Sequence, residues 1–356
     1  MPGEHRNVDL AVIGFGLAGA TLAWQAHDRG LSVLIIDDAD ANAASRVAAG
    51  LVTPVTGGKL KPQPDFSALA ARARAHYGRV VEGTGVKSYR ARPALRFLTE
   101  PRELEALAAI ERDGSALLQA FAKPVPDGIS ADGTPVLMAD AGRLAIGDYV
   151  DSLRRFFAAR GQVIAATVDA ASVSASDVGV RIDSLGVSAA NAVFCRGYRD
   201  HDNPLFPDLG WRAAKGQILE LDCPGFERRY TLHGRGIWMT AASDTTVLAG
   251  ATYEWDALDA TVTEDARDKL EASLRQLIDL PYTVIDQRAA VRPIVEGRMP
   301  VIGRSPQSPR TWLMNGLGSK GALFAPAVAE SLLAAIVSGE PIPARYCLER
   351  RVTASA

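Results

Sequence analysis

A glycine-rich turn near the N-terminus constrains this chain more than any other feature. Residues 14–19 read Gly-Phe-Gly-Leu-Ala-Gly, a G-x-G-x-x-G pattern. An apolar segment, residues 8–13, precedes the turn and predicts a short buried strand, and the alanine-rich residues 18–29 predict a helix. Residues 31–36 predict a second strand, which lies parallel to the first because a crossover helix connects them. The sequence therefore predicts a βαβ unit with a glycine turn after its first strand.

Each glycine of the turn has its own physical role. Gly14 permits the tight turn, Gly16 lets the main chain approach a pyrophosphate, and Gly19 lets the helix pack on the strand. The helix begins near Leu17 and Ala18, where free N–H groups and the helix dipole favour an anion. In this context the turn predicts a dinucleotide-binding site.

An acidic pair follows the second predicted strand. Asp37 stands 18 residues after Gly19, and Asp38 comes directly after it. A carboxylate there accepts hydrogen bonds from the ribose hydroxyls of an adenosine, and its charge disfavours a 2′-phosphate. This motif leaves FAD and NAD open. The alternative is a glycine turn in a doubly wound sheet that binds no dinucleotide.

Composition excludes several other classes of protein. The chain has 356 residues, which predicts two domains, and a net charge of -2, which makes nucleic acid an unexpected partner. Cys195, Cys223 and Cys347 have no Cys-x-x-Cys spacing, so we expect no disulfide framework and no metal site. Free thiols fit a reducing compartment and a cytoplasmic location. We expect no membrane span, because no stretch of about 20 apolar residues is uninterrupted.

Further elements follow from periodicity and turn residues. We expect helices over residues 65–79, 101–122, 148–160 with Asp148 as the N-cap, 263–278 and 326–338. We expect strands over residues 87–99, 135–139, 162–168, 179–182, 192–195 and 311–314, and strand-like residues over 217–250. A second glycine-rich turn, residues 316–321, indicates one site built from both ends of the chain.

Four segments resemble the D-amino-acid oxidase superfamily of FAD-dependent oxidoreductases, which includes glycine oxidase and sarcosine oxidase. They are the glycine turn with Asp37, the small-residue loop 44–51, the pair 290–293 and 299–303, and the closing loop 315–326. Together they span nearly the whole chain in the family's order. The Gly-Leu-Gly-Ser-Lys-Gly stretch of the closing loop is also similar to the FAD domain of the bifunctional tRNA 5-methylaminomethyl-2-thiouridine enzyme.

The resemblance implies noncovalent FAD and a set of residues around it. The loop after the second strand runs along the pyrophosphate and flavin, with Ser45, Arg46, Ala49, Gly50 and Leu51 in contact. Val168 is expected to contact the adenine through its main chain, and Gly197 to lie beneath the cofactor. The closing loop faces the flavin N1–C2=O edge and is formed by Gly316, Gly318, Ser319, Lys320 and Gly321. Negative charge builds at that edge on reduction, where oriented donors stabilise it. The alternative for Lys320 is a solvent-facing loop lysine.

The same resemblance implies substrate residues. Arg292 is expected to act in catalysis by binding a substrate carboxylate and to lie beside the cofactor, because its donor fork matches two carboxylate oxygens. The alternative is a structural ion pair, for example with Glu296. Trp238, Tyr253 and Trp255 are expected to form an aromatic wall, although core packing is the commoner role. His233 is a candidate base with a structural alternative. Ser319 stands where glycine oxidase has a second arginine.

These observations predict an α/β fold. A Rossmann-like FAD-binding domain (residues 1–88, 140–215 and 288–356) is joined to a mixed or antiparallel-sheet substrate domain (residues 89–139 and 216–287). The implied activity is oxidation of a C–N bond in an amino acid or secondary amine, by hydride transfer to flavin N5. The alternatives are a 2-hydroxy-acid or glycerol-phosphate-type dehydrogenase, an NAD-dependent dehydrogenase and a tRNA-modifying FAD domain. The partner is a small amine or amino acid, and the electron acceptor stays open among O2, a quinone and a protein.

Overall fold

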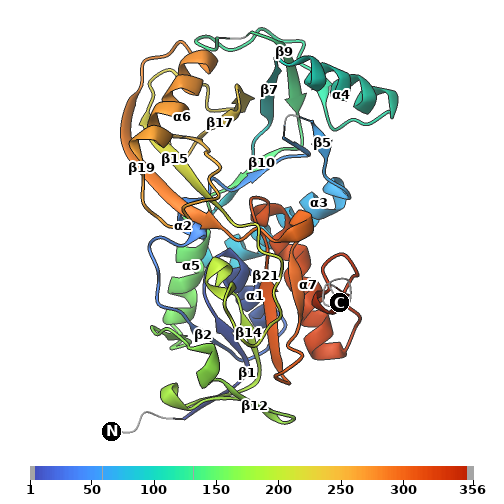
Figure 1. Cartoon of the computed structure of the whole chain (residues 1–356), viewed down its shortest axis with the longest axis vertical. Helices are drawn as coiled ribbons and strands as arrows, with labels where there is room; N and C mark the ends of the chain where they lie inside the picture. The colour runs from blue at the N-terminus through green and yellow to red at the C-terminus, as the bar shows by residue number, and fades with distance from the viewer. Residues whose placement is uncertain (1–4, 58, 131, 351–356) are drawn as a thin grey trace.

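Two large sheets organise the molecule, one above the other along its long axis (Figure 1). The computed structural model describes residues 5–57, 59–130 and 132–350. One sheet contains the N-terminal βαβ unit, and the other contains most of the strands between residues 94 and 292. The predicted α/β fold with a second, mixed sheet is confirmed, while the domain boundaries stay a prediction.

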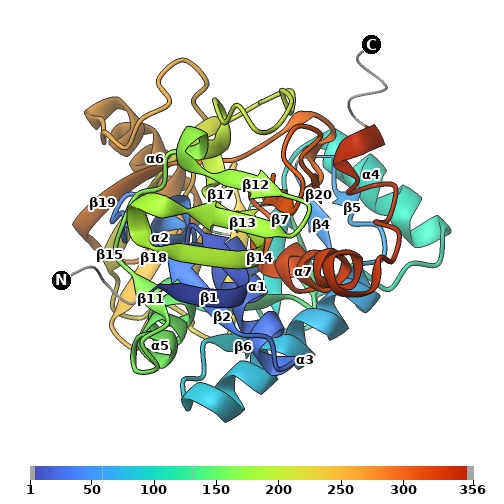
Figure 2. The ribbon, with the colours of Figure 1, turned by 90° about the horizontal axis from the view of Figure 1, so that it is seen from below.

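The first sheet has the order β11-β2-β1-β14-β13-β12, and β21 and β20 extend it beside β14. Its strands are β1 (Arg6–Ile13), β2 (Val33–Ile36), β11 (Val163–Ile164), β12 (Ser174–Ser176), β13 (Gly179–Ile182), β14 (Val187–Phe194), β20 (Val301–Arg304) and β21 (Thr311–Asn315). The first two strands pair in parallel, as predicted, and β1, β14 and β13 follow one another across the sheet (Figure 2). Central strands buried on both faces explain why β2 is a purely apolar run.

Four helices pack together and share a core with this sheet. They are α1 (Leu17–Asp28), α3 (Phe66–Thr84), α5 (Ile146–Ala158) and α7 (Gly321–Ser338). The alanine-rich face of α1 lies against α7, and Ala20, Ala23 and Ala26 are fully buried there. Small side chains allow this close approach, so the first and last helices of the chain meet beside the glycine turn.

The second sheet has the order β19-β15-β18-β17-β16-β7-β9-β8 and is antiparallel except between β16 and β7. Its strands are β7 (Ala94–Leu98), β8 (Gln119–Ala120), β9 (Thr134–Met138), β15 (Ala214–Asp222), β16 (Thr231–Gly234), β17 (Ile237–Ala241), β18 (Thr246–Gly250) and β19 (Thr283–Arg292). Its apolar core includes buried leucines of α6 (Glu264–Leu277), and α4 (Pro101–Arg112) lies near its far end.

The remaining elements are short. They are α2 (Ala44–Val47), β3 (Leu51–Val52), β4 (Val55–Thr56), β5 (Lys61–Pro62), β6 (Tyr89–Ala91), β10 (Gly142–Leu144) and the 3₁₀ turns Ala170–Ser172, Asp183–Leu185, Gly197–Asp200 and Glu296–Arg298. Three of them form a small sheet in the order β3-β10-β6.

The start of the last helix differs from the prediction. It begins at Gly321 rather than at Pro326, which lies inside it. Proline has no N–H, so the carbonyl of Ala322 lacks its α-helical donor. The Tyr77 hydroxyl donates to that carbonyl at 2.8 Å, which satisfies it from a helix 245 positions away in sequence. Such a contact cannot be read from local sequence.

Other predicted boundaries were also wrong. Residue 148 is not the N-cap of α5, which begins two residues earlier with Ala145 as its N-cap. The helix predicted over residues 101–122 ends at Arg112, just before Gly114 in a left-handed conformation. The strand predicted over 87–99 divides around Pro93, and that over 162–168 shortens to β11. In the last three cases the predicted element extended beyond the helix or strand that the structure contains.

One described helix is long and apolar enough to cross a membrane. This is α7, with a mean hydropathy of 1.7, and 61% of it is buried inside the protein. The core helix of a folded domain meets the same length and hydropathy criteria. Its packing against α1 and α3 accounts for its apolar sequence.

Candidate active site

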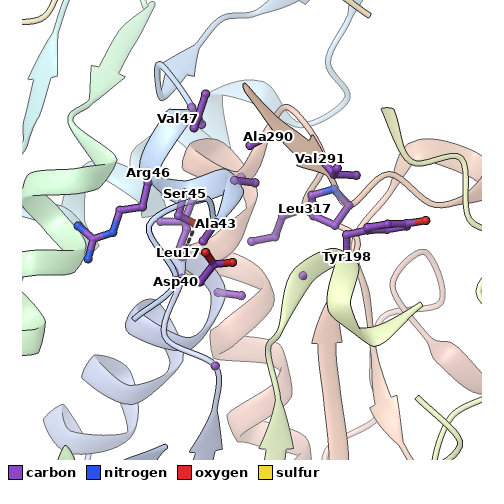
Figure 3. A pocket seen from close by; sticks show the side chains of 18 of the residues that line it. Leu17, Asp40, Ala43, Ser45, Arg46, Val47, Tyr198, Ala290, Val291 and Leu317 are labelled. Carbon is purple, nitrogen blue, oxygen red and sulfur yellow. Dashed lines mark hydrogen bonds between the residues drawn. The ribbon is translucent and has the colours of Figure 1, made fainter. Parts of the chain in front are cut away.

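A cavity of about 410 Å³ lies where the carboxyl ends of β1 and β2 face the second sheet. Both ends of the chain and both sheets contribute to its lining (Figure 3). Ligands of open α/β sheets bind in the crevice at the carboxyl ends of the strands. The cavity is therefore the candidate active site.

Most of the predicted site residues line this cavity. They are Gly14, Gly16, Leu17, Ala18, Asp37, Asp38, Ser45, Arg46, Ala49, Gly50, Leu51, Val168, Gly197, Trp238, Tyr253, Arg292, Gly318, Ser319 and Gly321. The predicted residues that lie outside its lining are Gly19, Gly316 and Lys320. Sequence segments separated by about 300 residues, such as those of Gly14 and Gly321, thus meet around one space.

The glycine turn has the geometry that a closely approaching ligand requires. Gly14 has a φ of +93°, and a Cβ atom there would lie 2.8 Å from the carbonyl oxygen of Cys195. A Cβ at Gly19 would lie 1.9 Å from the Gly14 carbonyl oxygen, so this glycine allows the helix to approach the turn. A Cβ at Gly16 would lie 2.8 Å from the Ser45 hydroxyl. Main-chain oxygens exclude side chains from Gly14 and Gly19, whereas a side chain at Gly16 would require Ser45 to move.

Asp37 ties the end of β2 to this turn. One carboxylate oxygen accepts from the main-chain N–H of Phe15 at 2.7 Å. The other accepts from the N–H of Ala39 at 2.9 Å and pairs with the guanidinium of Arg154 on α5. The neighbouring Asp38 pairs with Arg199 at 2.7 Å. The acidic pair lines the cavity with its orientation already fixed.

Two side chains of the segment after β2, Ser45 and Arg46, point toward different helices. The Ser45 hydroxyl accepts from the N–H of Leu17 at 2.9 Å. Arg46 extends away from this contact toward α5, where it meets Asp151 at 2.5 Å (Figure 3). Leu17 is thus a donor at the N-terminus of α1, where the helix dipole favours an anion.

Sequence reasoning missed a polar network beneath Gly197. Arg196 pairs with the buried carboxylate of Asp200 at 2.7 Å and donates to the carbonyl of Val168 at 3.1 Å. Asn315 donates to both Gly197, at 2.8 Å, and Asp200, at 3.0 Å. The network joins β14, its following turn and the end of β21. The four-residue spacing of the arginine and aspartate was the available signal for it.

Arg292 ends β19 at the cavity wall. Its guanidinium donates to the main-chain carbonyls of Thr252 at 3.1 Å and Lys215 at 3.3 Å. Its Cζ lies 4.2 Å from the centroid of the Tyr253 ring. Burial lowers the pKa of Arg292, against the opposing effects of Tyr253 and Glu254. Within residues 5–57, 59–130 and 132–350 no carboxylate forms an ion pair with this guanidinium.

The other candidate substrate residues differ in whether they line the cavity. Trp238 lines the cavity, whereas Trp255 is 62% exposed and does not. His233 lies on β16 outside the cavity lining. The ammonium of Lys320 donates to the side-chain oxygen of Gln63 at 2.8 Å, and burial lowers its pKa. Gln63 therefore orients this lysine, which neither faces the cavity nor stands free in solvent.

These residues fit a dinucleotide. A glycine turn without room for side chains, a helix N-terminus and a fixed carboxylate are the groups that hold an adenosine diphosphate. The closing loop also reaches the cavity and brings Gly318, Ser319 and Gly321 to its lining. Both glycine loops therefore line one cavity, and a flavin dinucleotide bound there would contact both of them.

Known proteins resemble the chain over most of its length. A family model described as FAD dependent oxidoreductase (DAO) matches residues 9–336. The tRNA 5-methylaminomethyl-2-thiouridine biosynthesis bifunctional protein MnmC of Caulobacter sp. (strain K31) is 32% identical over 349 residues, which are 94% of this chain and 55% of that protein. This chain therefore spans about half the length of that relative. Glycine oxidase of Pseudomonas putida is 25% identical over 96% of this chain and 99% of its own length.

Solved structures agree on the fold. Iminodiacetate oxidase from Chelativorans sp. BNC1 superposes with a TM-score of 0.76 at 23% identity, over 95% of this chain and 98% of that one. Glycine oxidase from Geobacillus kaustophilus gives a TM-score of 0.79 at 19% identity, over 96% and 98%. With the family match over residues 9–336, the chain belongs to the DAO family of FAD-dependent oxidoreductases and is an enzyme that uses FAD.

Proposed function

We propose that this enzyme oxidises the C–N bond of an amino acid or a secondary amine that carries a carboxylate. The observation that carries the proposal is Arg292, a largely buried guanidinium at the cavity wall whose described acceptors are main-chain carbonyls and an aromatic face. A buried cation without a carboxylate partner is costly, and a carboxylate ligand removes that cost.

The surrounding residues support such a ligand. The carbonyls of Thr252 and Lys215 hold the guanidinium, and Tyr253 covers its face. Trp238, Ile218 and Ala290 supply apolar cavity wall near the end of β19. Arg292 would orient the carboxylate, and the apolar wall would exclude water from the adjacent amine carbon. FAD, when bound, supplies a hydride acceptor at its N5 atom.

Similarity to named amine-oxidising proteins points the same way. The relatives include glycine oxidase, and the structural neighbours include iminodiacetate oxidase. Both names denote substrates in which an amine nitrogen is attached to a carboxymethyl carbon. Such a substrate fits one guanidinium beside an apolar wall, without a second arginine at Ser319.

A second candidate is an amine attached to a nucleoside in tRNA. It rests on the 32% identity to a protein whose name specifies 5-methylaminomethyl-2-thiouridine, itself a secondary amine. Oxidation of a C–O bond in a 2-hydroxy acid is a third. In all three a carbon atom loses hydride in the same cavity, and the candidates differ in that carbon and in the nitrogen or oxygen bonded to it. A cytoplasmic location fits each of the three candidates. None of them specifies the electron acceptor.

Anaerobic reduction separates these candidates. The FAD-loaded protein is mixed with glycine, N-methylglycine, iminodiacetate, proline, lactate, glycerol 3-phosphate and bulk tRNA, and flavin absorbance is followed. We expect bleaching by one or more carboxylate amines, because only these present both groups. Bleaching by lactate or glycerol phosphate alone would overturn the proposal, and bleaching by tRNA alone would select the second candidate.

A further inference from the structure

A second cavity lies beside the active site and is lined by arginines. It has a volume of about 160 Å³ and shares Arg46, Val47, Ala48 and Ile146 with the lining of the large cavity. Its remaining wall includes Arg143 and Arg288. The loop 46–48 therefore separates the two spaces.

The start of α5 forms one side of this second cavity. Ala145, Ile146, Gly147 and Asp148 all line it. The N-cap position, Ala145, offers no side-chain cap, and the first helical hydrogen bond is donated by Tyr149 at 3.0 Å. The N–H groups of the first helical turn have no acceptor within a helix. The cavity thus meets the positive end of a helix of 13 residues.

Arg143 faces this space without a carboxylate of its own. It is opposite Arg90 in the pairing of β10 with β6, a contact between like charges. Its Nε atom is buried and has no hydrogen-bond partner among the described residues. Burial and the positive charges of Arg92 and Arg90 lower the pKa of Arg143 to about 10, against the opposing charge of Asp148. Three guanidinium groups thus act on one another in the presence of one nearby carboxylate.

The other two arginines of this cavity are balanced. Arg46 pairs with Asp151, and Arg288 pairs with Glu220 and, at 3.4 Å, with Asp286. Among the described residues, Arg143 is the arginine of this cavity that forms no ion pair, although Asp148 lines the same cavity. A partly buried guanidinium without an ion-pair partner is stabilised by a ligand of opposite charge.

We propose that this second cavity is a binding site for a phosphate-type oxyanion, held by Arg143 and the N-terminus of α5. A phosphate carries up to two negative charges and several acceptor oxygens, which match a guanidinium fork and free main-chain N–H groups. A phosphate monoester and the phosphodiester of an RNA share this chemistry. This site does not depend on the reaction proposed above, because its test measures phosphate binding and not turnover.

Calorimetric titration of the FAD-loaded protein tests the site. Inorganic phosphate and a short RNA oligonucleotide are titrated separately in Tris-chloride buffer, with FAD filling the large cavity. We expect Arg143→Gln to weaken phosphate binding by about tenfold or more, since hydrogen bonds to charged groups are lost. Arg143→Lys keeps the charge and should weaken it less. Arg181→Gln is the matched control, because that arginine is exposed on β13 and pairs with Asp183.

Thermal unfolding separates a ligand site from a structural role. Without phosphate, Arg143→Gln should unfold at the same temperature as the parent or higher, because the repulsion from Arg90 and Arg92 is relieved. If Arg143→Gln does not fold, Arg143→Lys, which keeps the charge but loses the guanidinium fork, provides the comparison of phosphate binding. Competition between RNA and phosphate would identify a phosphodiester, and binding of phosphate alone would identify a free phosphate or a phosphorylated small molecule. Absence of binding by either probe, or equal binding by Arg143→Gln, would overturn the site.

Discussion

The guanidinium of Arg292 lies 4.2 Å from the centre of the Tyr253 ring, so an aromatic face covers a cation at the wall of the active-site cavity. The two residues come from the end of β19 and from the segment that follows β18. The same segment supplies the Thr252 carbonyl that accepts from this guanidinium. One short stretch of chain thus fixes both the position and the environment of the proposed carboxylate ligand.

Removal of the Arg292 side chain should weaken substrate binding while FAD stays bound. We expect Arg292→Gln to raise KM for a carboxylate amine by roughly tenfold to a hundredfold, because a charge-assisted interaction is worth about 1.5–3 kcal/mol. Steady-state kinetics with the best reducing substrate measures this. Tyr253→Phe keeps the ring over the cation and is the matched control, with little change expected. An unchanged KM in Arg292→Gln would refute the assignment.

Loss of Asp37 should loosen the cofactor. Asp37→Ala leaves the Phe15 N–H and the Arg154 guanidinium without their partner, at a cost of about 1–3 kcal/mol. We expect weaker FAD retention and a lower Tm, measured by flavin fluorescence after ultrafiltration and by thermal unfolding. Asp28→Ala, in an exposed ion pair with Arg79, serves as the control. Full FAD retention by Asp37→Ala would contradict the role of this carboxylate.

Two glycine-to-alanine changes should have opposite signs. Gly14→Ala combines a φ of +93° with a 2.8 Å approach to a main-chain oxygen, and should destabilise the fold by about 1–3 kcal/mol. Gly78→Ala lies within α3, where no atom stands within 4 Å of the added Cβ, and should stabilise by about 0.5–1 kcal/mol. Denaturant unfolding compares the two. A shift of the same sign in both variants would show that the turn geometry is not what restricts position 14.

His76 should make stability depend on pH. It is 1% exposed, its Nε2 atom lies 2.8 Å from the Tyr149 hydroxyl, and burial lowers its pKa to about 3. Below the unfolded-state value near 6.5 the unfolded chain binds a proton that the folded chain does not. Stability should therefore fall as pH drops from about 6.5 toward 3, by up to about 1.4 kcal/mol per pH unit.

The matched variant is His76→Gln, which cannot titrate. We expect the unfolding free energy of the parent to fall more steeply than that of the variant between pH 6.5 and 4.5, measured by denaturant titration at each pH. At pH 8 the variant should be the less stable of the two, since it loses the contact with Tyr149. Parallel pH profiles would show that folding does not lower the pKa of His76.

The sequence by itself determined the N-terminal βαβ unit and its glycine turn. These depend on contacts within about 30 residues: a strand, a turn that only glycine permits at Gly14, a helix and the carboxylate at Asp37. Local spacing encodes such contacts directly. The order of the four family segments added the second, mixed sheet, because that order belongs to a known fold.

Tertiary structure alone decided which charges surround the site. Arg154 reaches Asp37 across 117 positions, Tyr77 satisfies the carbonyl that Pro326 leaves open across 245, and Arg143 meets Arg90 across a strand pair. The ammonium of Lys320 donates to Gln63, 257 positions away in sequence. No local pattern marks these pairs, because each partner is an ordinary polar residue in its own segment. They become neighbours only when the sheets and helices pack, and burial then sets how strongly each pair acts.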